Sequence, residues 1–344
     1  MIVGLGKLAV FSLRKRMVRV QMLPGIPALY PICRYCRIFR QNGATMKRFF
    51  SVVFFLILAA FGSRQVMADS AGIDSSMYYP DIASYIVKQT DGKKVYMAKD
   101  TGMKIQPASL TKILTAIIAI ESGKLDQEVL ITKEATLVEP TKAGFKPGDR
   151  VKLIDLVKAA MVSSSNDAAF AIAIHLSGSV DRFVTAMNYR AKKIGMKRSN
   201  FTNPAGYDKG VYAGNVSTAE DLLALTEYAI RNRKFNEIAQ LESVLVTELT
   251  SGNMLLLKTH NKLLSRYPYT VGIKTGFTRR AGKCLIARAQ KEKSDLLLVM
   301  LNAKGDRWLI AEEMFEKAFA RELGRERDYA ASEGVDFNYR PWKR

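Results

Sequence analysis

The sequence predicts an α+β fold: an antiparallel β-sheet built from both chain ends, flanked by helices, with a mostly helical insertion. Two observations lead to this prediction. Strand-like apolar segments bounded by turn residues occur at 84–100 and again at 282–303. Between them, from about residue 125 to 240, the apolar residues recur mostly with helical spacing. Strands near both ends with helices between them most simply form one sheet with helices packed on it.

The first strands form a predicted hairpin. In SYIVKQTDGKKVYMAKD, residues 84–100, two β-prone runs flank Asp91-Gly92, a pair that favours a tight turn because both central positions need positive φ. A helix is then expected around Ser109, because Lys112 is followed by a nearly unbroken apolar run from Ile113 to Ile120. Lysine is seldom buried without a partner, so Lys112 at the start of a buried helix needs a chemical explanation.

The remaining elements follow in order. DRVKLIDLVKAAMV (149–162) and DAAFAIAIHLSG (167–178) are typical of apolar helices separated by a short serine-rich break. STAEDLLALTEYAI (217–230) predicts a third helix, since it opens with hydroxyl residues that can cap it and has acidic residues in its first turn. GKCLIARAQ and SDLLLVMLNA, within 282–303, predict a second hairpin, and 306–324 predicts a closing amphipathic helix.

The charge distribution separates the first 68 residues from the rest. The chain has 344 residues, 48% of them hydrophobic and 25% charged, which is typical of a globular protein. Of the net charge of +21, +11 comes from residues 1–68, which contain no Asp or Glu, and +10 from residues 69–344. The segment 46–68 combines a basic start, a short apolar core and a small-residue exit ending at Ala68. These are the parts of a secretory signal peptide.

We therefore predict a doubtful N-terminal extension at 1–45, a signal peptide at 46–68, a main domain at 69–323 and a polar C-terminal tail at 324–344. Because export signals begin near the start of a chain, translation is expected to start at Met46, and the protein to be secreted across the inner membrane. The alternatives are an uncleaved anchor, for which the apolar core is short, and a basic arm that binds nucleic acid or lipid. No nucleic-acid partner is expected.

Neither the cysteines nor the histidines predict a metal site. Cys33 and Cys36 form a single CxxC without a second pair, and Cys284 lies in an apolar stretch that favours a buried side chain. His175 is expected to pack or cap a helix, and His260 to be structural, with shaping of a cleft as the alternative. Because the sequence contains no HExxH pattern, a zinc peptidase has little support. No metal or cofactor is expected.

Ser109 and Lys112 provide the first chemical motif. Three residues apart on the predicted helix, they project from one face within side-chain reach. A serine hydroxyl is a poor nucleophile until a base removes its proton. Burial lowers the pKa of a lysine because desolvation disfavours the charged form, so a buried Lys112 can be that base. The spacing alone is a weak signal, because Ser12 and Lys15 share it.

Two further motifs strengthen this interpretation. The break between the apolar helices contains Ser164-Ser165-Asn166, and VGIKTGFT supplies Lys274-Thr275-Gly276 before the C-terminal strands. S-x-x-K, S-x-N and K-T-G in this order are typical of penicillin-binding proteins and serine β-lactamases. The sequence resembles the low-molecular-mass penicillin-binding proteins, which are D-alanyl-D-alanine carboxypeptidases of serine peptidase family S11. The resemblance runs from about Tyr79 to Leu323 and includes the blocks PASLTKILTA, PGDRVKLIDLVKAAMVSSSNDAA, GMKRSNFTNPAGY and STAEDLLALTEYAI.

The resemblance implies a β-lactamase/transpeptidase-like DD-peptidase fold for the domain at 69–323, and a set of catalytic roles. Ser109 is similar to the acylated nucleophile and Lys112 to its general base. Ser164 is similar to the residue that relays a proton to the leaving D-alanine nitrogen. The oxyanion hole would be the backbone N–H groups of Ser109 and Phe277. The neighbouring Asp167 is expected to be a helix-start residue or an ion-pair partner rather than a catalytic acid.

The resemblance also implies how substrate is held. Asn166 would hold the substrate amide, and Lys274 and Thr275 would engage the terminal carboxylate. Gly276 would let its strand approach the substrate closely. Position 277 is Phe where the family pattern has His or Tyr, which leaves the backbone N–H in place but puts specificity in doubt. Arg279-Arg280 is expected to be solvated, with steering of an anionic cell-wall substrate as the alternative.

The implied activity is removal of the terminal D-alanine from peptidoglycan stem pentapeptides, with β-lactam antibiotics as covalent inhibitors. A D,D-endopeptidase that cleaves cross-links uses the same catalytic set, and the sequence does not separate the two. A class A β-lactamase needs an E-x-x-x-N pattern that is absent between Ser164 and Lys274. A wall-binding protein with a disabled site is disfavoured, because every motif residue is present. The β-rich C-terminal domain and amphipathic anchor of many relatives are missing, so a soluble periplasmic enzyme without a stable membrane anchor is expected.

Overall fold

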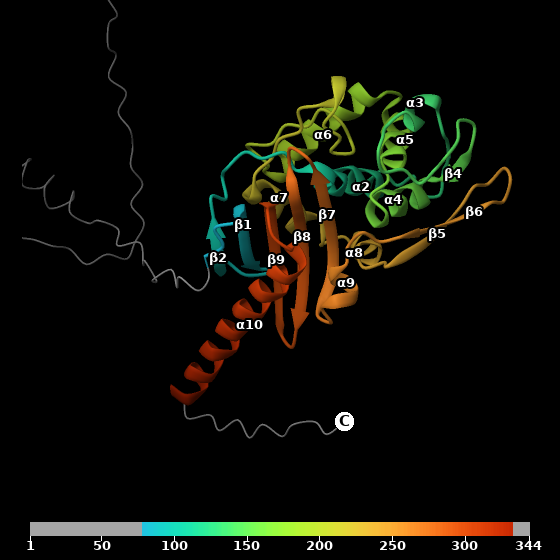
Figure 1. Ribbon diagram of the computed structural model, residues 1–344. Coiled ribbons are helices and arrows are strands. Elements are labelled where there is room, and N and C mark those ends of the chain that lie inside the picture. Colours follow the sequence, from blue (N-terminus) through green and yellow to red (C-terminus); the bar gives the residue numbers. More distant parts are fainter. Residues whose placement is uncertain (1–77, 333–344) are drawn as a thin grey trace, which may run out of the picture. The chain divides into compact units, whose positions relative to one another are not determined.

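The computed structural model describes residues 78–332, which include a five-stranded antiparallel sheet (Figure 1). Its strand order is β2-β1-β9-β8-β7. The strands are β1 (Ile82–Gln89), β2 (Val95–Lys99), β7 (Thr270–Thr278), β8 (Gly282–Lys291) and β9 (Ser294–Ala303). The predicted extension at 1–45, the predicted signal peptide at 46–68, and Cys33 and Cys36 lie outside the described residues, as does the chain beyond 332.

The pairing of β1 with β9 joins the two ends of the described chain. Ile82 lies opposite Ala303, and Gln89 lies opposite Leu296. The predicted α+β class, with an antiparallel sheet built from both chain ends, is therefore confirmed.

The turn between β1 and β2 is wider than predicted. The hairpin forms, but Gln89 N–H donates to Lys94 O at 3.0 Å, and neither residue of Asp91-Gly92 has a positive φ. The reason is that the end of β1 is tied to another strand. Thr90 N–H donates to Asp295 O, and Thr90 Oγ1 to Asp295 Oδ1, each at 2.8 Å. These bonds hold Thr90 against β9, so the chain turns back only after it.

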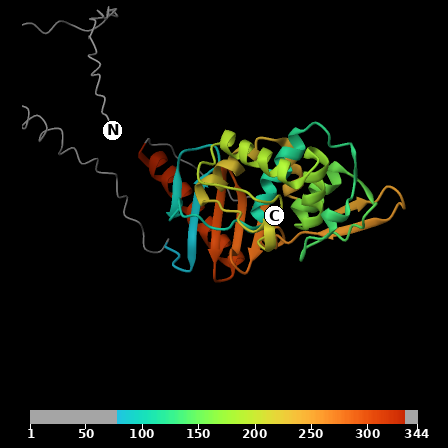
Figure 2. The ribbon, with the colours of Figure 1, turned by 90° about the horizontal axis from the view of Figure 1, so that it is seen from above.

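Most helices gather at the β7 end of the sheet, and a small β-hairpin projects beyond them (Figures 1 and 2). The longer helices are α2 (Lys112–Glu121), α4 (Leu153–Val162), α5 (Asn166–Ser177), α6 (Val180–Ile194), α7 (Ala219–Ala229) and α8 (Arg233–Ala239). The short ones are η2 (Ala108–Thr111), α3 (Lys133–Thr136), η3 (Gly210–Tyr212) and α9 (Leu263–Arg266). Two small hairpins join β3 (Glu128–Leu130) to β4 (Arg150–Lys152) and β5 (Ser243–Thr247) to β6 (Met254–Lys258).

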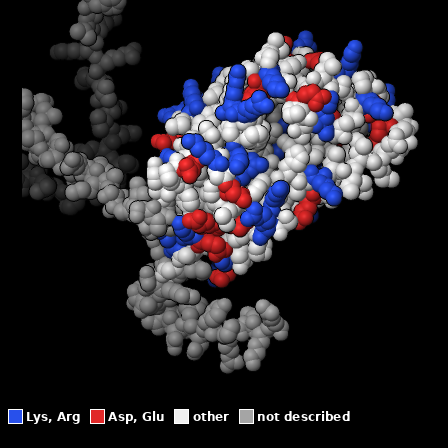
Figure 3. Space-filling view, viewed as in Figure 1, with Lys and Arg blue, Asp and Glu red and all other residues white. Residues whose placement is uncertain are grey.

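Both faces of the large sheet are covered. Helix α10 (Arg307–Ser332) packs on one face, and acidic side chains gather over it in Figure 3. In β9, alternate residues join the core under α10 or the core on the helical side. Since successive side chains of a strand point to opposite faces, this double burial explains the continuous apolar run from Leu296 to Leu301. Between residues 78 and 332, no helix is both long and apolar enough to cross a membrane.

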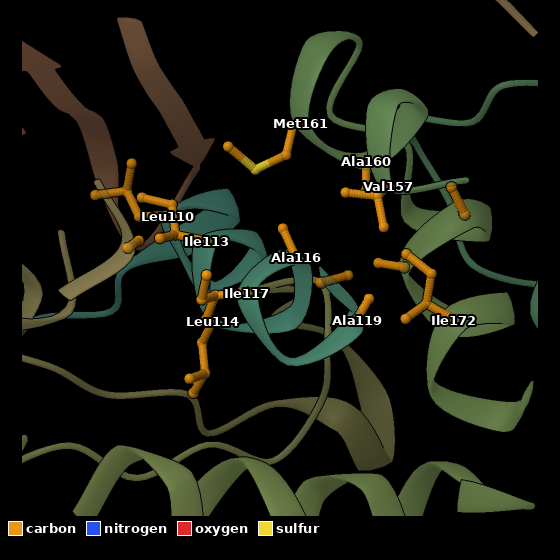
Figure 4. Close-up of a cluster of buried hydrophobic side chains, with 14 of the residues drawn as sticks. Leu110, Ile113, Leu114, Ala116, Ile117, Ala119, Val157, Ala160, Met161 and Ile172 are labelled. Carbon is orange, nitrogen blue, oxygen red and sulfur yellow. The ribbon is translucent and has the colours of Figure 1, made fainter. Parts of the chain in front are cut away.

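Helix α2 is the centre of the helical part. It contacts α4, α5, α6, α7 and α8, and Ile113, Leu114, Ala116 and Ile117 are fully buried. Figure 4 shows Ala116 and Ala119 on the side of α2 that faces labelled residues of α4 and α5, whereas Leu114 points to the opposite side. Each fully buried Ile or Leu contributes about 1.5–3 kcal/mol, so the apolar run that follows Lys112 fixes the helix in place and leaves its first turn facing the sheet.

Three boundaries differ from the sequence prediction. The helix expected at 149–162 begins only at Leu153, because Arg150–Lys152 pairs with β3. The β5–β6 hairpin was not predicted. Helix α10 continues to Ser332, into the segment predicted as a polar tail.

Candidate active site

Ser109 lies in the 3₁₀ turn η2, which leads into α2. The residue before it, Ala108, is buried and has a φ of 49°, which is uncommon for a residue with a side chain. Two glycines press on this turn. A Cβ on Gly276 would lie 3.2 Å from Ser109 N, and one on Gly206 would lie only 1.8 Å from Ala108 O. The turn is thus held between β7 and the loop that contains Gly206.

Lys112, the first residue of α2, is fully buried. Its Nζ lies 2.9 Å from Ser109 Oγ, 2.8 Å from Asn166 Oδ1 and 2.6 Å from Ala205 O. Burial, reinforced by the positive charge of Lys274, lowers the pKa of Lys112 well below its ordinary value. The environment therefore favours the neutral amine.

The three contacts also orient that amine. A neutral amine has two N–H bonds and one lone pair. The oxygens of Asn166 and Ala205 can only accept hydrogen bonds, so they take the two N–H groups. The lone pair is left for the Ser109 hydroxyl, which can donate its proton across the 2.9 Å separation.

The loop that supplies the Ala205 carbonyl is organised by Asn203. Asn203 Oδ1 accepts hydrogen bonds from the backbone N–H groups of Ala205, Gly206 and Tyr207 at 2.8–3.0 Å. Thr115 of α2 donates to Pro204 O at 2.6 Å, which ties the loop to the helix. Sequence reasoning gave this loop no role, since a backbone carbonyl has no side-chain signature. The signal that could have found it is the Asn-Pro-Ala-Gly turn within GMKRSNFTNPAGY.

The second motif lies between α4 and α5, and only part of it reaches the first. Asn166 contacts Lys112 through its side chain, and its backbone N–H donates to Thr141 O at 2.7 Å. Ser164 is buried, with a φ of 61°. Its hydroxyl forms no hydrogen bond with another described residue, so none joins it to Ser109 or Lys112.

The third motif lies on β7, at the edge of the sheet. Lys274 is 2% exposed, and its Nζ donates to Thr275 O at 3.0 Å. Burial, with the nearby positive charge of Arg307, lowers the pKa of Lys274 to about 7. Gly276 is the point where β7 meets η2, so its missing side chain allows that approach.

Arg307, at the start of α10, holds the backbone next to the third motif through hydrogen bonds. The sequence analysis did not predict this role. Its Nη1 donates to Gly276 O at 2.8 Å and to Cys284 O at 3.0 Å. The guanidinium group therefore bridges the backbones of β7 and β8 next to the motif. No motif marks this residue, because it acts through carbonyl groups that only the folded sheet brings together.

A cavity of about 720 Å³ opens beside Ser109. Of the predicted site residues, Ser109, Asn166 and Phe277 line it, while Lys112 and Lys274 are buried and do not. Phe277 lies opposite Lys283 of β8, and its side chain is 60% exposed. The rest of the lining comes from residues 140–141, 206–210, 213 and 278–280.

Comparison with known proteins identifies the family of this chain. The D-alanyl-D-alanine carboxypeptidase family, peptidase S11, matches residues 76–305, more than half of the chain. The chain belongs to this family. Three predictions are thereby confirmed: the chain is a member of family S11, it has the DD-peptidase fold, and it is a serine hydrolase.

Individual S11 relatives span most of the described chain. The D-alanyl-D-alanine carboxypeptidase DacF of Bacillus subtilis is 28% identical over 263 residues, covering 75% of this chain and 67% of that protein. The D-alanyl-D-alanine endopeptidase of Escherichia coli is 28% identical over 258 residues, covering 73% and 81%. The crystal structure of the D-alanyl-D-alanine carboxypeptidase from Mycobacterium tuberculosis H37Rv has a TM-score of 0.65 at 28% identity, covering 70% of this chain and 91% of that one.

In this S11 peptidase, Asp167 is a buried helix-start residue. Its carboxylate accepts hydrogen bonds from the backbone N–H groups of Ala143 and Gly144 at 3.0 and 3.1 Å. It forms no ion pair with a described residue, and its negative charge opposes the lowering of the Lys112 pKa. It therefore fixes the segment next to Thr141 at the cavity wall.

The histidines and the described cysteine differ in their distance from the site. His175 Nε2 is 3.2 Å from Gln127 Oε1, and the residue does not line the cavity. His260 is closer: burial and the charges of Lys274 and Lys112 lower its pKa. Cys284 is buried in β8, and burial raises its pKa to about 11. Within residues 78–332, no three metal-binding side chains of His, Cys, Asp or Glu lie together.

Proposed function

We propose that this protein is a serine-type D-alanyl-D-alanine carboxypeptidase that removes the terminal D-alanine from peptidoglycan stem pentapeptides. One observation carries the proposal: the buried Lys112 amine, with its lowered pKa, lies 2.9 Å from Ser109 Oγ beside an open cavity. A serine paired with a neutral base is what acyl transfer requires. Membership of family S11 supports peptides ending in D-alanyl-D-alanine as the substrate class.

Acylation begins when Ser109 Oγ attacks the carbonyl carbon between the two D-alanines and Lys112 Nζ takes the hydroxyl proton. The backbone N–H groups of Ser109 and Phe277 stabilise the negative charge that develops on the carbonyl oxygen. As the C–N bond breaks, the D-alanine nitrogen receives the proton from Lys112 through the Ser164 hydroxyl. Free D-alanine leaves, and the penultimate D-alanine remains as an ester on Ser109.

Deacylation repeats these steps with water. A water oxygen attacks the ester carbonyl while Lys112 takes one of its protons. The ester C–O bond breaks, Ser109 Oγ regains a proton from Lys112, and the shortened peptide leaves. Penicillins would acylate Ser109 through their β-lactam carbonyl in the same way, which accounts for covalent inhibition.

Substrate binding is assigned to the second and third motifs. Lys274 and Thr275 hold the terminal carboxylate, and Asn166 holds an amide of the substrate. Because β7 is an edge strand, an extended peptide can pair with it through backbone hydrogen bonds. We place this activity in the periplasm, after removal of the signal peptide at 46–68, with 69–323 as the catalytic domain.

The test is release of free D-alanine from a stem pentapeptide by the purified chain, with Ser109→Ala as the blank. We expect release by the wild type and none by the variant. Radiolabelled penicillin is likewise expected to label only the wild type. Covalent labelling of Ser109→Ala would show that another residue is the nucleophile.

The second candidate is a D,D-endopeptidase, which the similarity to the Escherichia coli endopeptidase favours. It uses the same acyl transfer with a larger leaving group. A cross-linked peptide dimer separates the two: cleavage of the dimer without release of D-alanine assigns endopeptidase activity. Penicillin labelling without cleavage of either peptide assigns a wall-binding role.

A further inference from the structure

Three basic side chains line the cavity beside Ser109 and take no part in the proposed chemistry. They belong to Lys209, Arg279 and Arg280. All three residues are exposed, and none forms an ion pair or a side-chain hydrogen bond with another described residue. Asp208 is the one acidic residue of this lining. The cavity wall therefore carries more positive than negative charge, and none of the three basic side chains is paired with an acidic side chain of the described chain.

The charges approach the cavity from two elements that are both fixed against Ser109. Arg279 and Arg280 directly follow β7, which contacts the Ser109 turn at Gly276. Lys209 belongs to the loop that contacts the same turn at Gly206. Backbone packing at Gly276 and Gly206 thus sets the positions of the two segments that carry these side chains.

The direction of β7 decides which part of a substrate meets these charges. In the proposed function, Lys274 holds the terminal carboxylate and Phe277 N–H binds the oxyanion. Arg279 and Arg280 lie in the turn that follows Thr278, the last residue of β7, so they come after Phe277 on the side away from Lys274. On that side lies the acyl part of the peptide, which consists of the penultimate D-alanine and the residues that precede it.

We propose that Arg279 and Arg280, with Lys209, form a subsite for a carboxylate on the residue that precedes D-alanyl-D-alanine. This inference rests on the proposed function, because it takes the peptide's direction from it. Guanidinium groups bind carboxylates through charge-assisted hydrogen bonds, often in pairs. The subsite selects peptides that are anionic at this position over neutral peptides of similar size.

The experiment compares two peptides, acyl-Lys-D-Ala-D-Ala with the lysine amine either succinylated or acetylated, so that they differ mainly in one carboxylate. The full chain and the double variant Arg279→Gln/Arg280→Gln are assayed for D-alanine release. In the variant, kcat/KM for the succinylated peptide is expected to fall about tenfold, and that for the acetylated peptide to change less than about twofold.

The matched control is Arg182→Gln/Lys192→Gln, which removes the same charge from exposed positions on α6 that do not line the cavity. It is expected to leave both peptides within about twofold of the wild type. An equal loss on both peptides in the Arg279/Arg280 variant overturns the subsite. So does an equal selective loss in the control, since long-range attraction would then explain the preference.

Penicillins separate this inference from the proposed function. Carbenicillin carries a carboxylate on its acyl side chain that benzylpenicillin lacks, and acylation of Ser109 by each needs no peptide turnover. If neither peptide is hydrolysed but the double variant loses about tenfold toward carbenicillin alone, the subsite stands and the carboxypeptidase assignment fails. If peptides are hydrolysed without discrimination by charge, the subsite fails and the carboxypeptidase assignment stands. If Ser109 reacts with neither class, both fail.

Discussion

Lys112 and Lys274 are two buried lysines whose proposed roles need opposite protonation states. Lys112 must be neutral to accept the Ser109 proton, whereas Lys274 must be positive to hold a carboxylate. Burial lowers both pKa values, and the charge of Lys274 lowers that of Lys112 further. The second lysine therefore helps to keep the first one neutral, as long as it keeps its own proton.

The lowered pKa of Lys274 predicts an alkaline fall in kcat/KM on a peptide with a free terminal carboxylate. The rate falls above about pH 7 as Lys274 becomes neutral, because kcat/KM reports groups of the free enzyme. D-Alanine release measured across neutral pH tests this. A peptide ending in an amide is the control, since it should lack the alkaline fall; a plateau for the carboxylate peptide would contradict the role of Lys274.

The burial of Lys274 also predicts that Lys274→Met raises the melting temperature while abolishing turnover. The pKa of Lys274 is about 7 in the folded protein and about 10.4 in an unfolded chain, so protonation favours unfolding. The destabilising effect of the protonated, buried Lys274 is full below pH 7 and fades as the pH rises toward 10.4. Calorimetry should show a gain of a few degrees at pH 6 that shrinks at pH 9. A lower melting temperature at pH 6 would show that Lys274 stabilises the fold.

The proximity of Ser109 and Lys112 could be predicted because the two residues are only three positions apart. They lie within one helical turn whichever type of helix forms. Ser164 and Asn166 could be placed near them only through the family resemblance. Ala205 and Arg307 have no side-chain motif that marks their roles, because their contacts are with or through backbone carbonyls. Those contacts exist only once a distant loop and helix have packed.

At the scale of elements, the position of Ser109 depends on the close packing of β7 and the 203–207 loop against η2. The sequence indicated a helix around Ser109, but the structure has a 3₁₀ turn there, and the first residue of this turn, Ala108, has a left-handed conformation. The sequence shows no sign of this, because alanine normally favours a right-handed helix. The conformation is imposed by the neighbouring backbone.

This packing predicts that Gly206→Ala is far more damaging than Gly123→Ala. Both glycines have positive φ, 78° and 71°, but a Cβ on Gly123 has no atom within 4 Å, whereas one on Gly206 overlaps Ala108 O. Gly123→Ala should lower the free energy of unfolding by about 1–2 kcal/mol. Gly206→Ala should lower it by at least about 3 kcal/mol and slow acylation by penicillin. Equal losses in urea denaturation would show that the overlap relaxes without effect.

The large strands were predictable and the small ones were not, for one physical reason. β8 and β9 are buried on both faces, which leaves long apolar runs between turn residues. Arg150–Lys152 has one buried residue between two exposed ones and directly precedes an apolar helix. Three residues are too few for the period of a strand to stand out from that of the helix that follows.

At the scale of the whole molecule, the proposed signal peptide at 46–68 predicts a secreted protein that begins at Asp69. The physical reason is the small side chain at Ala68, which a signal peptidase needs at the cleavage position. Mass spectrometry of secreted protein should give the mass of residues 69–344. Ala68→Arg is the control and should retain the segment. A wild-type protein that keeps 46–68 would instead support the uncleaved anchor.

The pairing of β1 with β9 has a consequence for synthesis. Ile82 is made early and Ala303 near the end of the described chain, yet the two lie side by side in the sheet. Contacts between such distant positions form late, because the chain must close a long loop first. The growing polypeptide therefore cannot finish its sheet until its last strand has left the ribosome. Strand β7 is also synthesised late, and it packs against the turn that contains Ser109. A chain that lacks β7 therefore lacks the contact that positions this serine.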